Sequence, residues 1–286
     1  VALFLAAVMA STELKSRLVW LVLGATVASI MLGALQIASD DTRFYLWPAA
    51  YGGGVEGFFA NRNHLATLLL ASLPFAAVMA GASLRRRDDR HRTALWLGAL
   101  FMGLVIVAIG VVRSRAGIIL IGPSLILSLL AAWIAAGRGR PGPALLGVAA
   151  AISIAIAAVG LFALAPIMDR FDTDLSVESR FALWPYVVEA ARTYLPVGSG
   201  LGSFDPVFRS VEPLDRLDPT YFNQAHNEYL ETWLETGWMG ITLIIVFLVW
   251  WGRRSWSCWC APPSRGTDLQ RAASAAILMV LIHSFA

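Results

Sequence analysis

The chain has 286 residues, of which 58% are hydrophobic and only 14% are charged, and its mean hydropathy is +0.67. Soluble domains carry about 25% charged residues. This composition therefore excludes an ordinary soluble globule, a disordered tail and a disulfide-stapled secreted module. The net charge of +3 does not indicate nucleic-acid binding, because the basic residues lie in loops between apolar runs. The composition indicates an integral membrane protein.

Seven apolar runs predict membrane-spanning helices. About 20 helical residues cross a hydrocarbon core of about 30 Å, and most of the runs reach that length. The short run at 238–252 gains length if the helical pattern extends back to Asn227. Only helices satisfy their own backbone groups in lipid, and the runs lack the alternation of a barrel. The runs lie at 18–38, 64–84, 94–112, 116–136, 144–165, 238–252 and 270–286.

The arginines and the single lysine predict the orientation of these helices. Thirteen of the 22 basic residues lie in one set of loops, and four lie in the short loops on the other side. By the positive-inside rule the first set is cytoplasmic. The segment 166–236, with twelve acidic residues and five arginines, then lies outside the cytoplasm.

We therefore expect an all-α polytopic membrane protein, a bundle of transmembrane helices with one long, partly helical periplasmic loop. The expected organisation is transmembrane helices with short loops at 1–165, the periplasmic loop carrying the site at 166–236, and C-terminal transmembrane helices at 237–286. The sequence opens at Val1 within a helical pattern and stops inside an apolar run, so we expect a fragment that lacks helices at both ends.

The segment Asn61-Arg62-Asn63-His64 opens the second apolar run. A helix N-terminus presents free backbone N–H groups, and the Arg62 guanidinium adds positive charge beside them, so an anion is expected to bind there. The alternative interpretation is structural: Asn61 or Asn63 caps the helix, and Arg62 lies at the membrane interface.

The turn Arg113-Ser114-Arg115 joins two charge-free runs on the side where arginines are scarce. Arginine suits bidentate capture of phosphate, and this favours a phosphate role for Arg115 and, less strongly, for Arg113. The alternatives are snorkelling of the two side chains to the interface and the general preference of this sequence for arginine over lysine.

The long loop carries three further features. A helix predicted at 176–194 places Arg180 on its apolar side, where the guanidinium needs an anion, either an acidic side chain of the loop or a ligand. The glycine turn around Gly200 and Gly202 permits close approach of the backbone to another group and is weak evidence by itself. Asp172 and Asp174 have a spacing suited to Mg²⁺, but such pairs often arise by chance in an acidic loop.

The segment 225–240 carries the most specific signal. Glu228, Glu231 and Glu235 form an acidic stripe, and His226 shares with Tyr229, Leu230 and Trp233 the opposite face, which is expected to point toward the membrane helices. An imidazole with a pKa near 6.5 can act as a base around neutral pH. The alternative for His226 is a satisfied core histidine.

Together these residues resemble the O-antigen ligase and polymerase superfamily of bacterial envelope glycosyltransferases. His226-Asn227, nine residues, and then Gly237-Trp238-Met239-Gly240 match that family's His-(Asn/Ser/Gln)-x9-Gly-x-x-Gly signature. The same pattern includes Arg115 in Ser-Arg-Ala-Gly, Arg180 in Glu-Ser-Arg-Phe, the glycine turn ending in Ser203-Phe204, and Asn61-Arg62-Asn63-His64. The resemblance runs from about Gly52 to Gly240. Members of the family usually have about a dozen spans, more than this chain.

The resemblance implies an inverting, metal-independent glycosyl transfer without a cofactor, on the periplasmic side of the bacterial inner membrane. The donor would be a glycan on undecaprenyl diphosphate. The acceptor would be a sugar hydroxyl of the lipid A core in a ligase, or another lipid-linked glycan in a polymerase. The implied site comprises the base His226, the diphosphate-binding residues Arg115, Arg180 and Arg62, and the supporting residues Asn227, Arg113, Asn63, Gly200 and Gly202.

Two other classes of protein share the predicted spans. A polysaccharide or lipid transporter is one of them. Ion-coupled transporters usually place ionisable side chains near the membrane midplane, and the runs at 94–112, 116–136 and 144–165 contain none. A non-catalytic scaffold would need only the folded loop and would tolerate substitution of His226 and Arg115. Ligase and polymerase stay equally open, because both use the same donor chemistry.

Overall fold

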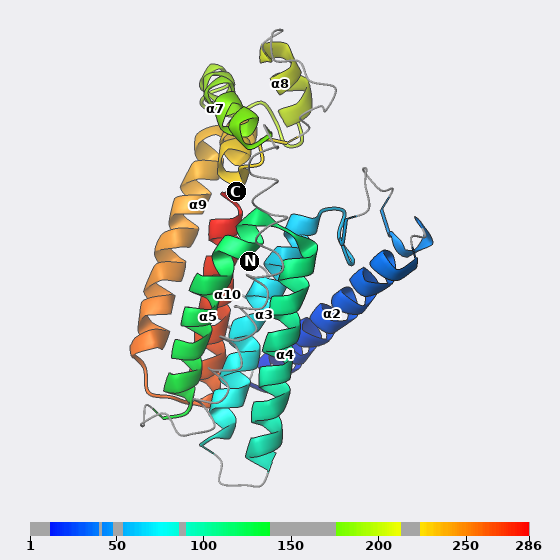
Figure 1. Cartoon of the computed structure of the whole chain (residues 1–286). Coiled ribbons are helices and arrows are strands. Elements are labelled where there is room, and N and C mark those ends of the chain that lie inside the picture. Colours follow the sequence, from blue (N-terminus) through cyan, green and yellow to red (C-terminus); the bar gives the residue numbers. More distant parts are fainter. Residues whose placement is uncertain are drawn as a thin grey trace. The chain divides into compact units, whose positions relative to one another are not determined.

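The computed structural model describes residues 12–39, 42–47, 54–85, 90–137, 176–212 and 224–285. Every regular element within these residues is a helix (Figure 1). The elements are α2 (Thr12–Ser39), the short 3-10 helix η1 (Thr42–Phe44), α3 (Arg62–Ser83), α4 (Arg90–Val112), α5 (Arg115–Ala135), α7 (Ser176–Thr193), α8 (Phe204–Val211), α9 (Glu228–Cys260) and α10 (Arg265–His283).

Five helices are long and apolar enough to cross a membrane: Glu13–Ser39, Arg62–Ser83, Thr93–Val112, Arg115–Ala135 and Glu228–Cys260. They coincide with five of the predicted runs, and the chain is an all-α polytopic membrane protein. The predicted run 144–165 lies outside the described residues. The run 270–286 falls in helix α10, which is not among the five because its first turns carry charged and polar side chains such as Asp268 and Arg271.

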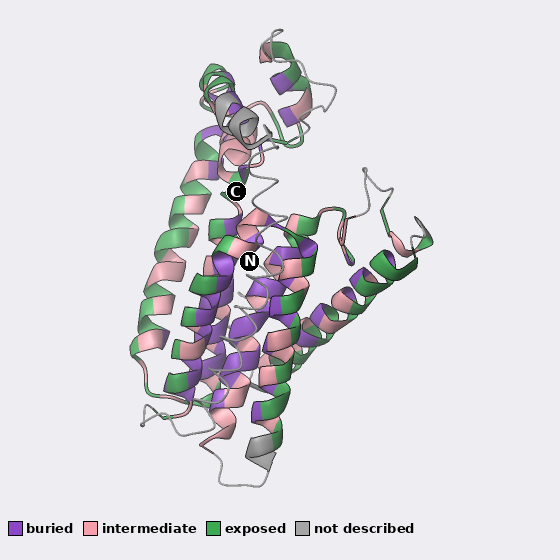
Figure 2. Ribbon diagram, in the orientation of Figure 1, coloured by how far each residue is buried: buried purple, intermediate pink, exposed green. Residues whose placement is uncertain are grey.

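The chain divides into two compact units, Val1–Met168 with Ser255–His283 and Asp169–Arg254 with Ser284–Ala286. In the first unit α3 is the central helix and contacts α2, α4, α5 and α10. Its buried side chains interlock with those of α4, and Figure 2 shows the buried residues along the facing sides of the bundle. Members of this core include Leu65, Leu69, Leu73, Val105, Ile106 and Ile109.

Glycine brings α3 and α5 close together at both ends of their contact. A Cβ atom at Gly81 would lie 2.3 Å from the carbonyl oxygen of Ala132, and one at Gly117 would lie 2.9 Å from the Cβ of Ala66. Small residues at such positions let two helix backbones approach within a membrane. The outer faces carry exposed apolar side chains such as Trp96, as expected of helices that face lipid.

The second unit has its own apolar core, built from α7, α8 and the first turns of α9. Apolar residues recur at helical spacing on α8 and meet the apolar sides of the other two helices. The predicted helix at 176–194 is confirmed as α7, Ser176–Thr193. The core contains Leu183, Val187, Ala190, Ala191, Phe204, Val207, Phe208, Ala225 and Leu234.

The first turns of α9 contribute to this core. Leu230 and Trp233, on the face expected to point toward the membrane helices, pack against the core formed with α7 and α8. In the acidic stripe, the carboxylates of Glu231 and Glu235 accept hydrogen bonds from the backbone N–H groups of Ala225 and Phe204. The first turns of α9 thus hold the segment before the helix, at Ala225, and the start of α8, at Phe204.

Candidate functional site

The first group of candidate residues lies where α3 and α5 begin, at the same end of the bundle (Figure 1). Asn61 caps α3 by accepting a hydrogen bond from the Asn63 N–H at 2.8 Å. Ser114 caps α5 by accepting one from the Gly117 N–H at 3.1 Å. The Ser114 hydroxyl also donates to the Asn63 side-chain oxygen at 2.8 Å. The two helix N-termini are therefore held side by side.

Three arginines flank these caps. Arg62 and Arg115 are the first residues of α3 and α5, and Arg113 immediately precedes the cap Ser114. Arg62 and Arg113 are exposed and Arg115 is half-buried. Arg113 has a φ of 55°, an uncommon backbone conformation for a residue with a Cβ. Helix N-termini attract anions through their free N–H groups, so this end of the bundle combines two such termini with three guanidinium groups.

The loop before α3 is anchored by a glutamine that the sequence analysis missed. The Gln36 side-chain oxygen accepts from the N–H groups of Glu56 and Gly57, both at 3.0 Å. Its side-chain N–H group donates to the Gly57 carbonyl at 3.1 Å. Burial raises the pKa of the Glu56 carboxyl, and the neighbouring Arg62 partly offsets this rise. A buried amide inside the first apolar run is the signal that could have identified Gln36.

The second group of candidates surrounds a break in α9. Gly237 has φ 57° and ψ −141°, which interrupts the helix. The carbonyl groups of Leu234 and Glu235, which lose helical partners there, accept hydrogen bonds from the N–H groups of Ser199 and Gly200, each at 2.9 Å. The Trp238 N–H donates to the Pro196 carbonyl at 3.0 Å. The glycine turn is thus fixed to the break through backbone bonds on both sides.

Gly198 and Gly237 are the glycines that permit this close contact. A Cβ at Gly198 would lie 2.4 Å from the Glu235 carbonyl oxygen, and one at Gly237 would lie 2.2 Å from that of Pro196. Gly200 and Gly202 have positive φ values of 107° and 75°, but no atom of the described residues lies within 4 Å of their Cβ positions. These two glycines provide the left-handed backbone conformation that the turn requires.

His226 is held between two fixed backbone segments. The buried side chain of Asn227 caps α9 by accepting from the N–H groups of Tyr229 and Leu230, at 3.1 and 3.2 Å. On the other side, the Ala225 N–H donates to the Glu231 carboxylate at 3.1 Å. His226 itself is half-buried and has a φ of 51°. Non-glycine residues in such conformations cluster at functional sites.

A ring cluster supports the same segment from the end of the chain. The Phe285 ring lies edge-on to Trp184, with centroids 5.5 Å apart, and 6.5 Å from the Tyr229 ring. The Trp184 indole N–H donates to the Ala225 carbonyl at 3.3 Å. This bond fixes the residue immediately before His226.

Three candidate residues remain, Arg180, Asp172 and Asp174. Arg180 lies on α7, in the part of that helix whose side chains are outside the described residues. Asp172 and Asp174 also lie outside them. Where the structure is described, no three His, Cys, Asp or Glu side chains form a group suited to a metal ion.

Comparison with known proteins gives one result. A family model described as O-antigen ligase matches residues 99–245, slightly more than half of the chain. The matched region runs from α4 into α9 and includes the arginine turn at the start of α5, α7, the glycine turn and the break at Gly237. No curated protein and no solved structure shows a significant match to the chain.

Proposed function

Because the chain belongs to the O-antigen ligase family, we propose that it transfers a glycan from undecaprenyl diphosphate to a sugar hydroxyl of the lipid A core. The reaction takes place at the periplasmic face of the bacterial inner membrane. The family match supports a reaction of the O-antigen ligase or polymerase type, and lipid-linked glycans as substrates, in a multi-pass membrane protein.

The observation that carries the proposal is the paired helix N-termini of α3 and α5. The Ser114–Asn63 hydrogen bond joins two helix ends that each begin with an arginine. We assign Arg62 and Arg115 to the diphosphate of the donor, with Arg113 and Asn63 in support. Arg180 joins this set on the strength of its sequence motif. A prealigned charge of this kind contributes about 10²–10³-fold to the rate when it stabilises a charge that develops in the transition state.

The base in this proposal is His226. It removes the proton from the acceptor hydroxyl while the hydroxyl oxygen attacks the anomeric carbon of the donor sugar. The bond from that carbon to the diphosphate breaks, and its electron pair stays on the leaving diphosphate. The imidazolium then releases its proton to solvent. A single displacement inverts the anomeric carbon, and general-base assistance typically contributes about 10²–10⁴-fold.

The fixed backbone around His226 supports this role. Asn227 caps the helix that follows, and Ala225 is held by both Glu231 and Trp184. A base must lie within hydrogen-bond reach of the proton it removes. Restraint on both neighbours limits the positions that the imidazole can take.

The function is tested by deleting the gene and analysing surface glycans on gels. Loss of all long chains from lipid A supports the ligase, single-repeat products assign the polymerase reaction instead, and an unchanged glycan pattern overturns the proposal. Complementation with His226→Ala should restore protein in the membrane but no transfer. The control is Gln224→Ala, a change at an exposed residue near His226, which should restore both the protein in the membrane and the transfer. Full transfer by His226→Ala would show that His226 is not the base.

A further inference from the structure

A pocket of about 350 Å³ lies in the membrane unit among α2, α3, α4 and α10. It is located where α3 ends and α10 begins, whereas the arginine-flanked caps lie at the start of α3. Its walls are largely apolar and include Val19, Trp20, Val78, Met79 and Leu269. The proposed glycosyl transfer does not use this pocket.

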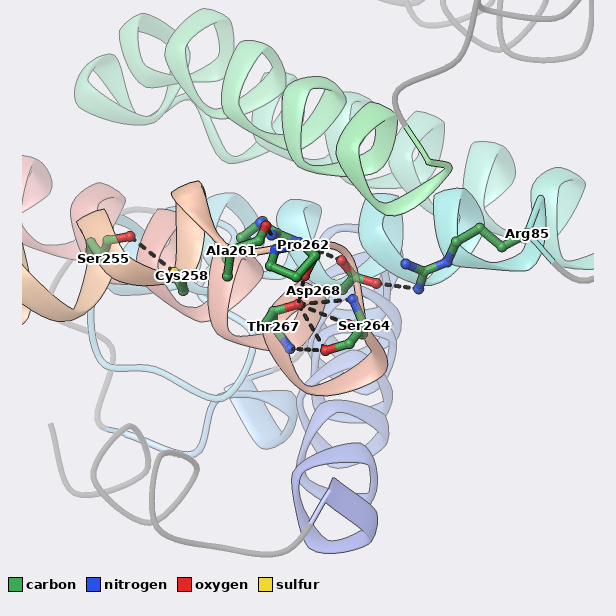
Figure 3. Close-up of polar contacts among 9 residues, drawn as sticks. Arg85, Ser255, Cys258, Ala261, Pro262, Ser264, Thr267 and Asp268 are labelled. Carbon is green, nitrogen blue, oxygen red and sulfur yellow. Dashed lines mark hydrogen bonds and ion pairs between the residues drawn. The ribbon is translucent and has the colours of Figure 1, made fainter.

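One edge of the pocket carries a buried ion cluster. Arg85, just after α3, pairs with Asp268 in the first turns of α10, as Figure 3 shows. Arg271 donates to the other oxygen of Asp268 at 2.6 Å and also to the Ala261 carbonyl. Asp268 and Arg271 are 1% and 0% exposed. Within the described residues, two guanidinium groups thus share the Asp268 carboxylate.

The start of α10 is fixed, so this cluster has a defined geometry. The Ser264 N–H donates to the Thr267 hydroxyl at 2.9 Å, and the Thr267 N–H donates to the Ser264 hydroxyl at 3.2 Å (Figure 3). The Asp268 N–H donates to the Ser264 carbonyl at 2.9 Å. This reciprocal cap holds Asp268, and through it Arg85, at the pocket edge.

Arg265 contributes a second guanidinium group to the pocket. This arginine lines the pocket, is exposed, and forms no ion pair within the described part of the chain. Arg85, whose side chain is 27% exposed, lines the pocket together with its partner Asp268, which is 1% exposed. The pocket therefore presents two guanidinium groups above an apolar wall. This arrangement is complementary to a molecule with an anionic head and a hydrocarbon tail.

We propose that this pocket binds an anionic phospholipid. The phosphodiester lies between Arg85 and Arg265, and an acyl chain follows the wall formed by Val78 and Met79. Basic pockets between transmembrane helices bind anionic lipid head groups in this way. A free phosphate would satisfy the arginines but would leave the apolar wall without a partner.

The test is native mass spectrometry of the purified full chain in detergent, with dioleoylphosphatidylglycerol, dioleoylphosphatidylcholine or inorganic phosphate added. Phosphatidylglycerol should be retained and phosphatidylcholine should be lost. Arg265→Gln should weaken retention about five-fold, the effect of one basic residue near a lipid head group. Arg253→Gln, which alters an exposed arginine that does not line the pocket, should retain the lipid as the wild type does.

A second variant distinguishes binding of a lipid from binding of free phosphate in this pocket. Ala94 lines the pocket, and Ala94→Trp fills part of its volume while leaving both arginines in place. The variant should lose phosphatidylglycerol. Equal retention of both phospholipids by the wild type, or retention unchanged by Arg265→Gln, would overturn the proposal. Binding of inorganic phosphate that competes with the lipid supports the arginine site, whereas phosphate binding without lipid retention contradicts a lipid pocket.

Discussion

Arg62 and Arg115 occupy the same position in two neighbouring helices, the first residue after the cap. The N-terminus of a helix carries about half a positive charge, so a guanidinium there is repelled by its own helix. Arg62 also lies near the Glu56 carboxyl, whose pKa it lowers against the effect of burial. A bound diphosphate is attracted by both helix ends and both arginines, which is why we assign a ligand to this position.

The planar geometry of the guanidinium predicts that a lysine at position 115 will not support glycan transfer as Arg115 does. A planar fork binds two phosphate oxygens at once, and an ammonium group acts as a point charge. We therefore expect Arg115→Lys to lose nearly as much transfer as Arg115→Ala, about 10²-fold. Glycan attachment in the deletion strain, normalised to the amount of protein in the membrane, measures the effect.

The control for this prediction is Arg253→Lys, which changes an exposed arginine outside the candidate site. That variant should transfer at the wild-type rate. Full transfer by Arg115→Lys would mean that only the charge matters at this position. In that case bidentate binding of the diphosphate by Arg115 would be wrong.

Helix α9 is interrupted at a single residue, Gly237. Gly237 interrupts the helix with a positive φ, and its missing side chain leaves room for the Pro196 carbonyl. Strain of about 1–3 kcal/mol is expected for a residue with a Cβ in such a conformation, and the contact with Pro196 adds to it. Gly237→Ala should therefore lower the midpoint of thermal unfolding in detergent and release the glycine turn to proteolysis.

The same helix offers a matched control. Gly252 also lies in α9, but none of the described residues comes within 4 Å of its Cβ position. Gly252→Ala should leave the midpoint unchanged or raise it, because alanine is favoured over glycine in a helix by about 1 kcal/mol. If both variants unfold at the wild-type midpoint, the break at Gly237 is not held by the glycine turn.

The helices themselves were predictable, because hydropathy and capping are local properties of the sequence. The cap of α3, which was expected at Asn61 or Asn63 and is Asn61, and the five spans follow from residues within one segment. The bond from Ser114 to Asn63 joins residues far apart in sequence, and no local pattern indicates it. The hydrogen bonds between the glycine turn and the break at Gly237 also join residues far apart in sequence, and no local pattern indicates them. The motif drew attention to both segments, but only the fold shows that their backbones bond to each other.

For the whole molecule, the proposed reaction predicts independence of divalent metal ions. The energy for transfer is already present in the diphosphate bond of the donor, and arginines in place of a metal stabilise the leaving group. EDTA should therefore leave transfer in isolated membranes unchanged. Loss of transfer that is restored by Mg²⁺ would return Asp172 and Asp174 to consideration as ligands.

The orientation of the chain in the membrane can be tested with thiol chemistry. Helix α9 has 33 residues and ends at Cys260, which is exposed, next to the basic segment expected to be cytoplasmic. Ser210 is exposed on α8, within the segment expected to be periplasmic. In spheroplasts, a membrane-impermeant maleimide should label Ser210→Cys, introduced with both native cysteines replaced by serine. The native Cys260 should react only after lysis.

This experiment bears on function as well as topology. The proposed donor is consumed at the periplasmic face, so the glycine turn and His226, which belong to the same compact unit as Ser210, must be reached from that side. Labelling of Cys260 in intact spheroplasts, with Ser210→Cys protected, would reverse the orientation predicted from the arginines. The imidazole would then face the cytoplasm, and the proposed transfer to lipid A in the periplasm would be excluded.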